Sequence, residues 1–271
     1  MESRIAGAMG MKYQPIAILW SDEKPEGAMQ FEKSRWGCVM GAFGATAEKG
    51  RVAVFDRESY GCWGGGVGLG FGNAYHAFFG GMDCFCRFLS SGNEPDPKGR
   101  AVAEQCASFL RGEMREHFLH GEGYRKSPEL VDKAIQNMPI TEVPTRYVIF
   151  KPLAQLAEGE TPVVVVFLAD PDQMSALVVL ANYGREDNEN VIIPFGAGCQ
   201  TIGIFAYREA KSQPQRAVVG LTDLSARKYL RRLGKELTTF AVPFAMFQEM
   251  EANVEGSFLQ RDTWKSLRQG A

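Results

Sequence analysis

The chain has 271 residues, of which 45% are hydrophobic, and a formal net charge of −2 at pH 7. This length allows one large domain or two ordinary modules, and the near-neutral charge gives no electrostatic reason to expect a nucleic acid partner. The N-terminus has no apolar stretch of secretory length, and the longest apolar runs, 163–169 and 176–181, are too short to span a bilayer. We therefore expect a cytoplasmic protein with neither nucleic acid nor membrane as a partner.

The first half of the chain begins with two predicted strands. Residues 13–20 and 51–55 are apolar runs, and a short helix is expected around Cys38, between them. A glycine-rich segment follows at 61–72. Residues 99–118 then place apolar side chains at helical spacing.

Another helix is predicted from its start signal. Ser127 is the expected N-cap, Pro128 stands at the first helical position and Glu129 places an acid in the first turn. This helix should end near Asn137, before Pro139.

The second half of the chain predicts a sheet with helices on both sides. The run TPVVVVFL at 161–168 is continuous and β-branched, as in a strand that is buried on both faces. Further strands are expected at 146–150, 191–194, 201–206 and 217–221, and helices at 174–183, from the cap Asp223 to about 235, and at 243–253. Strands that alternate with helices predict an α/β fold, a mixed sheet covered by helices, in a single domain over 1–271.

An internal duplication of 13–72 and 160–208 is a second interpretation of the same elements. Strand and glycine-turn patterns recur in the same order in both segments, and Cys62 then falls opposite Cys199. Two duplicated α/β modules packed together are therefore an alternative to chance similarity between strand-turn-strand patterns.

The glycine-rich segment carries candidate cofactor contacts, because glycine lets a ligand approach the backbone closely. The two glycine motifs that bind nucleotides are Gly-x-Gly-x-x-Gly and Gly-x-x-x-x-Gly-Lys-Ser/Thr. Neither can be aligned with this segment, which argues against a phosphate-binding loop. Two interpretations remain, a tightly packed turn and a loop that admits a cofactor beside Cys62. In the second interpretation the cofactor-binding residues are Gly61, Gly64, Gly65, Gly66 and, in the later turn, Gly198.

Six cysteines are the most informative chemical signal, whereas three histidines are too few to favour histidine-based chemistry. In a cytoplasmic chain the cysteines should be reduced thiols or metal ligands. Cys106 lies on the apolar stripe of a predicted helix and is expected in the core. The predicted metal ligands are Cys38, Cys62, Cys84, Cys86 and Cys199. Thiolates favour iron–sulfur clusters, zinc or copper, and the alternatives are inert core cysteines or a reactive nucleophile.

Ligation of one metal or cluster requires these cysteines to meet. Cys62 and Cys199 should lie close together, because equivalent turns of two α/β units fall at strand carboxyl ends, where ligands gather. Cys38 and one or both of Cys84 and Cys86 should lie near them. Cys84 and Cys86 can both present their sulfurs only on a non-helical turn.

Short motifs occur along most of the chain. They are Pro15-Ile16-Ala17, the isolated Cys38, Gly61-Cys62-Trp63-Gly64 with Leu69-Gly70, Phe150-Lys151-Pro152-Leu153, Cys199 and Thr239-Phe240-Ala241-Val242-Pro243. Together they resemble the uncharacterised ArCR family, domain of unknown function 169. The resemblance implies an intracellular prokaryotic protein and carries over no catalytic residues.

Two classes of function are compatible with these residues. In the first, the protein is a cysteine-ligated metal or iron–sulfur protein in redox chemistry or cofactor handling, with a redox partner protein. In the second, it is a metal-free binding module or enzyme that holds a small molecule between the glycine-rich segment and the surrounding aromatic residues. No motif in the sequence identifies a reaction.

Overall fold

The computed structural model describes residues 1–231 and 233–269, and the chain divides into two compact units. The first unit combines Met1–Phe71 with Thr141–Ala271, and the second is Gly72–Ile140. The second unit is therefore an insertion between two segments of the first. The sequence-based expectation of a single domain over 1–271 did not include this division.

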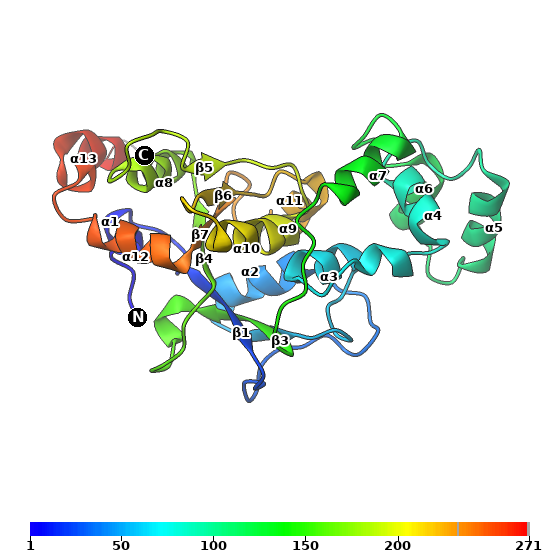
Figure 1. The fold of residues 1–271 in the computed structure, drawn as a ribbon, viewed down its shortest axis with the longest axis horizontal. Coiled ribbons are helices and arrows are strands. Elements are labelled where there is room, and N and C mark those ends of the chain that lie inside the picture. Colours follow the sequence, from blue (N-terminus) through cyan, green and yellow to red (C-terminus); the bar gives the residue numbers. More distant parts are fainter. Residues whose placement is uncertain (232, 270–271) are drawn as a thin grey trace. The chain divides into compact units, whose positions relative to one another are not determined.

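The first unit is built on a mixed sheet of seven strands, counted within the described residues (Figure 1). The strand order is β2-β3-β1-β4-β7-β6-β5, and neighbouring strands are antiparallel except β5 and β6. The strands are β1 (Ile16–Ser21), β2 (Ala53–Phe55), β3 (Tyr147–Pro152), β4 (Val164–Ala169), β5 (Val191–Ile192), β6 (Ala217–Val219) and β7 (Thr238–Pro243). The predicted α/β fold with a mixed sheet is confirmed.

The central strand β4 explains why this sheet needs helices on both faces. It pairs with β1 on one side and β7 on the other, and all of its residues are buried. A strand with no polar face has to be covered on both sides, as the run at 161–168 predicted. The sequence analysis did not predict β7, whose run is short and begins with two threonines.

Helices cover both faces of the sheet. They are α1 (Arg4–Ala8), α2 (Val39–Lys49), α3 (Trp63–Leu69), α8 (Pro171–Asn182), α9 (Gly198–Ile202), α10 (Ile204–Lys211), α11 (Leu224–Leu230), α12 (Phe244–Ala252) and α13 (Asp262–Gln269), with 3-10 turns at Leu153–Gln155 and Phe258–Gln260. On one face, Phe167 of β4 packs against Phe247 of α12, with ring centroids 6.0 Å apart. On the other face, Phe43 of α2 packs against Phe150 of β3, also with 6.0 Å between ring centroids.

The second unit is helical throughout its regular elements. They are a 3-10 turn at Ala74–Ala77, α4 (Gly81–Phe88), α5 (Pro97–Gln105), α6 (Glu113–His120) and α7 (Pro128–Gln136). Aromatic rings form its core, with Phe78 in contact with Phe85, Phe88 and Phe118. The predicted helix start is confirmed, because the Ser127 hydroxyl accepts the N–H of Leu130 at 3.4 Å.

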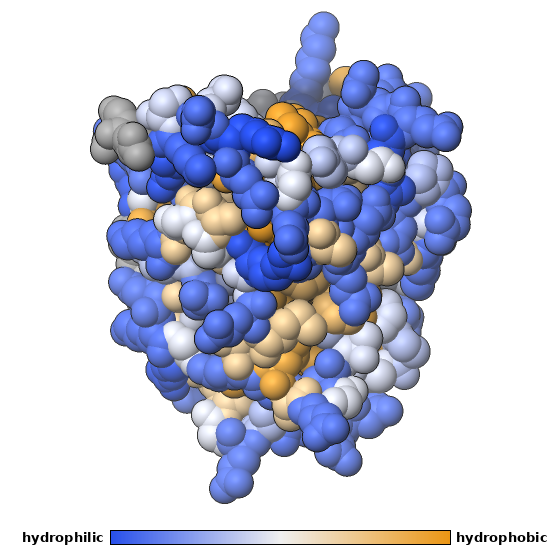
Figure 2. Space-filling view, turned by 90° about the vertical axis from the view of Figure 1, so that its left-hand side faces the viewer, coloured by the Kyte–Doolittle hydropathy of each residue, from blue (hydrophilic) through white to orange (hydrophobic). Residues whose placement is uncertain are grey.

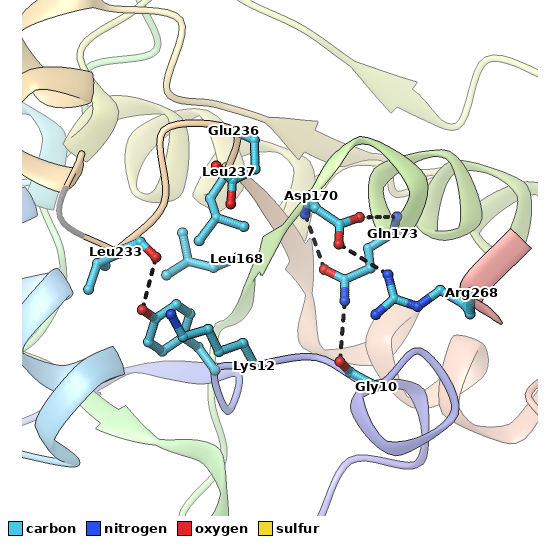
Figure 3. A pocket seen from close by; sticks show the side chains of 10 residues that line it. Gly10, Lys12, Leu168, Asp170, Gln173, Leu233, Glu236, Leu237 and Arg268 are labelled. Carbon is cyan, nitrogen blue, oxygen red and sulfur yellow. Dashed lines mark hydrogen bonds and ion pairs between the residues drawn. The ribbon is translucent and has the colours of Figure 1, made fainter. Parts of the chain in front are cut away.

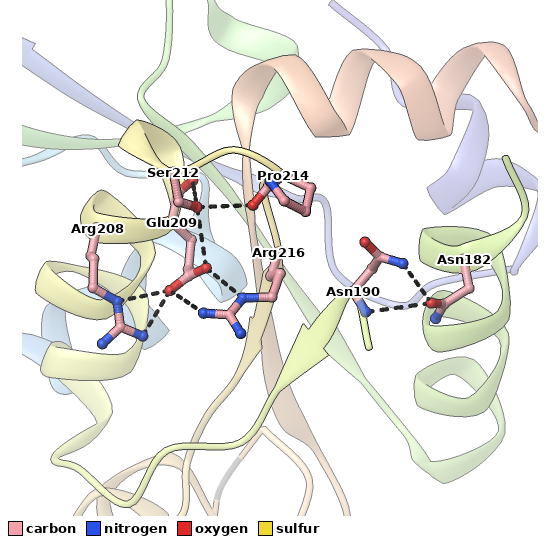
Figure 4. Close-up of polar contacts among 7 residues, drawn as sticks. All are labelled: Asn182, Asn190, Arg208, Glu209, Ser212, Pro214 and Arg216. Carbon is pink, nitrogen blue, oxygen red and sulfur yellow. Dashed lines mark hydrogen bonds and ion pairs between the residues drawn. The ribbon is translucent and has the colours of Figure 1, made fainter. Parts of the chain in front are cut away.

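A buried carboxylate anchors α10 in the first unit (Figure 4). Glu209 is fully buried, and it accepts hydrogen bonds from Nε of Arg208 at 2.8 Å and Nε of Arg216 at 2.9 Å. Burial acts to raise the pKa of Glu209, but the hydrogen bonds from Arg216 and Arg208 outweigh it and hold the pKa below its ordinary value. In the same view, the side-chain amide of Asn190 donates to Oδ1 of Asn182 at 3.0 Å. This hydrogen bond links the residue before β5 to the end of α8.

Two sequence-based expectations about the backbone are wrong. The run 201–206, predicted as a strand, forms the end of α9 and the start of α10, with Gly203 between them. Because this segment is buried, its apolar residues do not show which period the backbone follows. The glycine-rich segment forms the helix α3 instead of a turn or loop.

The fold does not show the duplication of 13–72 and 160–208. Both segments run strand, helix, strand, helix. In the sheet, however, one strand separates β1 from β2, whereas two strands separate β4 from β5. The connecting helices α2 and α8 also pack on opposite faces.

Much of the molecular surface in view in Figure 2 is hydrophilic, with an apolar band near its middle. Val179 and Tyr183 of α8 are among the large apolar side chains that are exposed. Across the described residues, every helix is too short or too polar to cross a membrane.

Candidate functional site

Three of the predicted ligand cysteines stand at the starts of three helices in the first unit. Cys38 is the N-cap of α2, Cys62 is the N-cap of α3, and Cys199 lies in the first turn of α9. The first N–H groups of a helix have no partner within the helix and carry a partial positive charge. The sulfurs of Cys38 and Cys62 therefore lie beside backbone N–H groups that favour negative charge.

The segments that lead into Cys38 and Cys62 run side by side. A Cβ placed on Gly61 would lie 2.3 Å from the carbonyl oxygen of Gly37, so the two backbones touch where any side chain would clash. Gly61 also has φ +80°, which other residues rarely adopt. Glycine at position 61 therefore allows the two segments to come together.

Glycine also brings α3 against α9. A Cβ on Gly68 would lie 2.7 Å from the carbonyl carbon of Cys199, and a Cβ on Gly203 would lie 1.9 Å from the carbonyl oxygen of Gly68. A Cβ on Gly65 would meet Val39, the residue after Cys38, at 2.7 Å. The four glycines of α3 (Gly64, Gly65, Gly66 and Gly68) cost helix propensity, and this close packing is the compensating gain.

Two of the sulfurs make hydrogen bonds to α3. The N–H of Gly65 donates to Sγ of Cys62 at 3.3 Å, and the thiol of Cys199 donates to the carbonyl oxygen of Gly64 at 3.1 Å. Cys62 and Cys199 thus meet around the first turn of one helix. This proximity of Cys62 and Cys199 rests on helix packing and not on the duplicated sheet edge from which it was expected.

The three thiols affect one another electrostatically. Burial, with a smaller contribution from the neighbouring Cys38, raises the pKa of Cys62 to about 11, although the N–H of Gly65 opposes this rise. Burial raises the pKa of Cys199 strongly, with added contributions from Cys62, Cys38 and Asp223. Burial likewise raises the pKa of Cys38, although the N–H groups of Gly41 and Met40 oppose it. All three thiols are therefore neutral near pH 7 when nothing is bound.

Asp223 joins the helix that carries Cys199 to α11. Its carboxylate accepts the N–H of Gly198 and the N–H of Ala226, each at 2.8 Å. The sequence analysis identified Asp223 as a helix cap but not as a neighbour of the cysteines. Its position between a strand and a helix signalled the cap, whereas the bond to Gly198 depends on tertiary contact.

The predicted cofactor-binding glycines have different surroundings. Gly61 and Gly65 are packed against backbone or side chains, and Gly198 lies 3.0 Å from Met40 and from Ala226 when a Cβ is added. The N–H of Gly66 donates to the carbonyl of Cys62 within α3, at 2.9 Å. At Gly64 an added Cβ would meet nothing within 4 Å except Sγ of Cys62, at 4.0 Å. There is therefore room beside this sulfur.

Cys84 and Cys86 belong to the second unit and lie within the helix α4. The expected non-helical turn is wrong, because the α4 backbone is helical through both residues. Side chains two positions apart on a helix do not face each other, so these two sulfurs are not presented together. Burial raises the pKa of both thiols, that of Cys86 to about 11. Cys106, expected in the core, is only half-buried, at the end of α5.

The soft thiol donors and the space beside Gly64 fit a thiophilic metal or cluster in chemistry. The side chains are not arranged as a metal site, since the described residues contain no group of three or more His, Cys, Asp or Glu side chains placed to hold a metal ion. Ligation would require the side chains of Cys38, Cys62 and Cys199 to turn toward a common centre.

The fold and this site define a two-unit α/β protein in which one buried and two half-buried cysteines stand at helix starts. The chain belongs to the Uncharacterised ArCR family, domain of unknown function 169, whose family model matches residues 4–253. Neither the curated proteins nor the solved structures gave a match to the chain.

Proposed function

We propose that Cys38, Cys62 and Cys199 bind a soft metal ion or an iron–sulfur cluster, and that the protein serves redox chemistry or cofactor handling. The observation that carries this proposal is that three cysteines, one buried and two half-buried, stand at the starts of α2, α3 and α9 and affect one another electrostatically. Free cysteines are common as small buried residues, but cysteines that fill space on three separate helices have no need to share one location.

The electrostatics of the three thiols favour a cation as the missing partner. Each thiolate would be destabilised by burial and by its neighbours, which is why the pKa values are raised. A metal ion among the sulfurs would replace their protons and reverse this repulsion. When bound, such a group supplies a site for electron transfer or for transfer of the metal itself.

The protein residues around the sulfurs would tune and shield that group. The N–H of Gly65 already donates to Sγ of Cys62, and such N–H···S bonds stabilise a thiolate. The hydrogen bond from Cys199 to Gly64 would be lost on deprotonation, which frees that sulfur to turn. The space next to Gly64 would receive the added volume.

The proposal places the protein in the reducing cytoplasm, where these cysteines stay free of disulfides. It also calls for a redox partner protein or an acceptor for the metal.

Anaerobic purification with metal and acid-labile sulfide analysis tests the proposal. We expect a thiolate-to-metal absorption band and bound metal in the parent chain, and their loss in Cys38→Ser, Cys62→Ser and Cys199→Ser. Cys106→Ser, in the second unit, is the matched control and should retain the metal. A protein that binds no thiophilic metal after anaerobic reconstitution, or that binds it equally well without Cys62, would favour the metal-free small-molecule function.

Gly64→Ala separates a metal site from a structural role of the same cysteines. The added methyl group meets only Sγ of Cys62, so the fold should be unchanged or slightly stabilised. It nevertheless fills the space beside the sulfur, and we expect weaker metal binding. Gly7→Ala, in α1, is the control, because an added Cβ there also meets nothing within 4 Å and Gly7 is far along the chain from the cysteines.

A further inference from the structure

A small cavity lies in the first unit at the carboxyl end of β4, where the strand leads into α8 (Figure 3). Its volume is about 150 Å³, and its walls come from the segment before β1, from β4 and α8, from the segment before β7, and from α13. The proposed metal site uses none of the residues that line this cavity.

Charged side chains line this cavity in balanced numbers. Lys12 and Glu236 are both exposed at the rim of the cavity. Neither side chain has an ion-pair partner among the described residues. Asp170 and Arg268 form an ion pair at 3.1 Å on another wall. Two positive and two negative groups sum to zero, so the cavity favours neither a simple anion nor a simple cation.

Hydrogen bonds hold the wall at α8 in place. Asp170 accepts the N–H of Gln173 at 2.8 Å, and the side chain of Gln173 accepts the N–H of Asp170 at 3.1 Å. The amide of Gln173, which is almost fully buried, also donates to the carbonyl of Met9 at 3.3 Å. These bonds fix the polar wall before any ligand arrives, and they lower the ordering cost of binding.

The remaining surface of the cavity is apolar. Leu168, Leu233 and Leu237 line it, and Tyr13 is held by the hydrogen bond from its hydroxyl to the carbonyl of Leu233 at 3.0 Å. Lys12 lies over the Tyr13 ring at 5.0 Å from its centroid. A bound molecule would therefore meet an apolar floor with opposite charges around it.

We propose that this cavity binds a small zwitterion, an α-amino acid with an aliphatic side chain. The carboxylate would face the Lys12 ammonium, the ligand ammonium would face the Glu236 carboxylate, and the aliphatic group would lie on Leu168. The cavity volume is close to the roughly 150 Å³ of an engineered cavity that holds benzene, which limits the ligand to that size range.

Isothermal titration with L-leucine tests this proposal. Two analogues serve as comparisons: 4-methylpentanoate lacks the ammonium group, and 3-methylbutylamine lacks the carboxylate. We expect saturable binding of L-leucine and at least about tenfold weaker binding of both analogues. Absence of saturable leucine binding at millimolar concentration, or equal binding of either analogue, would overturn the proposal.

Four charge-removing variants complete the test. Lys12→Gln and Glu236→Gln should each weaken leucine binding about tenfold. Lys235→Gln and Glu158→Gln, which change exposed groups outside the cavity, should leave it unchanged. Because all four positions are exposed, the variants should fold, and equal affinity in all four would contradict the proposed contacts.

Discussion

The two units of this protein both bury cysteines, but they place them differently. In the first unit Cys38, Cys62 and Cys199 stand at helix starts that glycines bring together. In the second unit Cys84 and Cys86 lie inside one helix among aromatic rings. Burial raises the thiol pKa values in both units, so a raised pKa does not by itself mark a site. What distinguishes the first unit is that separate elements carry sulfurs to one place.

The largest effect is expected from the glycines that create this convergence. Gly68→Ala would drive a methyl group against the backbone of Cys199, at 2.7 Å in the present structure, and neither backbone can move without displacing its helix. We expect a loss of about 3 kcal/mol in the free energy of unfolding, measured by urea denaturation. Gly64→Ala in the same helix is the control and should not destabilise the protein. Equal stability of the two variants would mean that α3 and α9 are not packed through Gly68.

A smaller effect is expected at the buried charge that anchors α10. Glu209→Gln should cost about 2 kcal/mol, because it leaves Arg208 and Arg216 without their carboxylate, and their partial exposure reduces the loss.

The same variant gives a pH test. The pKa of Glu209 is lowered in the folded state, so its stabilising contribution is present above the ordinary carboxyl pKa and is lost as the pH falls through the lowered value. Unfolding curves of the parent chain and the variant should therefore converge in acid and separate toward neutral pH. A stability difference that is constant from acid to neutral pH would contradict the ion pairs.

The smallest effect is expected in the second unit. Ser127→Ala removes the hydroxyl that accepts the N–H of Leu130 and should cost about 1 kcal/mol. Ser108→Ala, at an exposed position in the same unit, is the control. Thermal unfolding that is unchanged by Ser127→Ala would count against this cap.

The sequence predicted those features that depend on local patterns. The β-branched run at 161–168 predicted the buried strand β4, and Ser127 and Asp223 were identified as helix caps because capping chemistry is local. The helix α3 was missed because its four glycines oppose helix formation, and only the contacts with α9 and Val39 compensate. The segment 201–206 was predicted as a strand because a fully buried run has no polar face to reveal its period.

The candidate site was predicted in part. Cys62 and Cys199 were expected to lie close together because of a duplication that the fold does not show. The helical backbone of α4, which keeps the sulfurs of Cys84 and Cys86 from being presented together, depends on tertiary packing and was not predicted. The contacts of Asp223 with Gly198 and of Gly37 with Gly61 join segments distant in sequence, and no local pattern reports them.

X-ray absorption at the zinc edge of the reconstituted protein tests the central claim most directly, since it counts the sulfur ligands of the bound ion. We predict three sulfurs at about 2.3 Å in the parent chain and the same number in the double variant Cys84→Ser with Cys86→Ser. Cys62→Ser should lose one sulfur or the metal itself. An unchanged sulfur count in Cys62→Ser, or a loss of sulfur ligands in the Cys84 and Cys86 double variant, would contradict a site formed by the three thiols of the first unit.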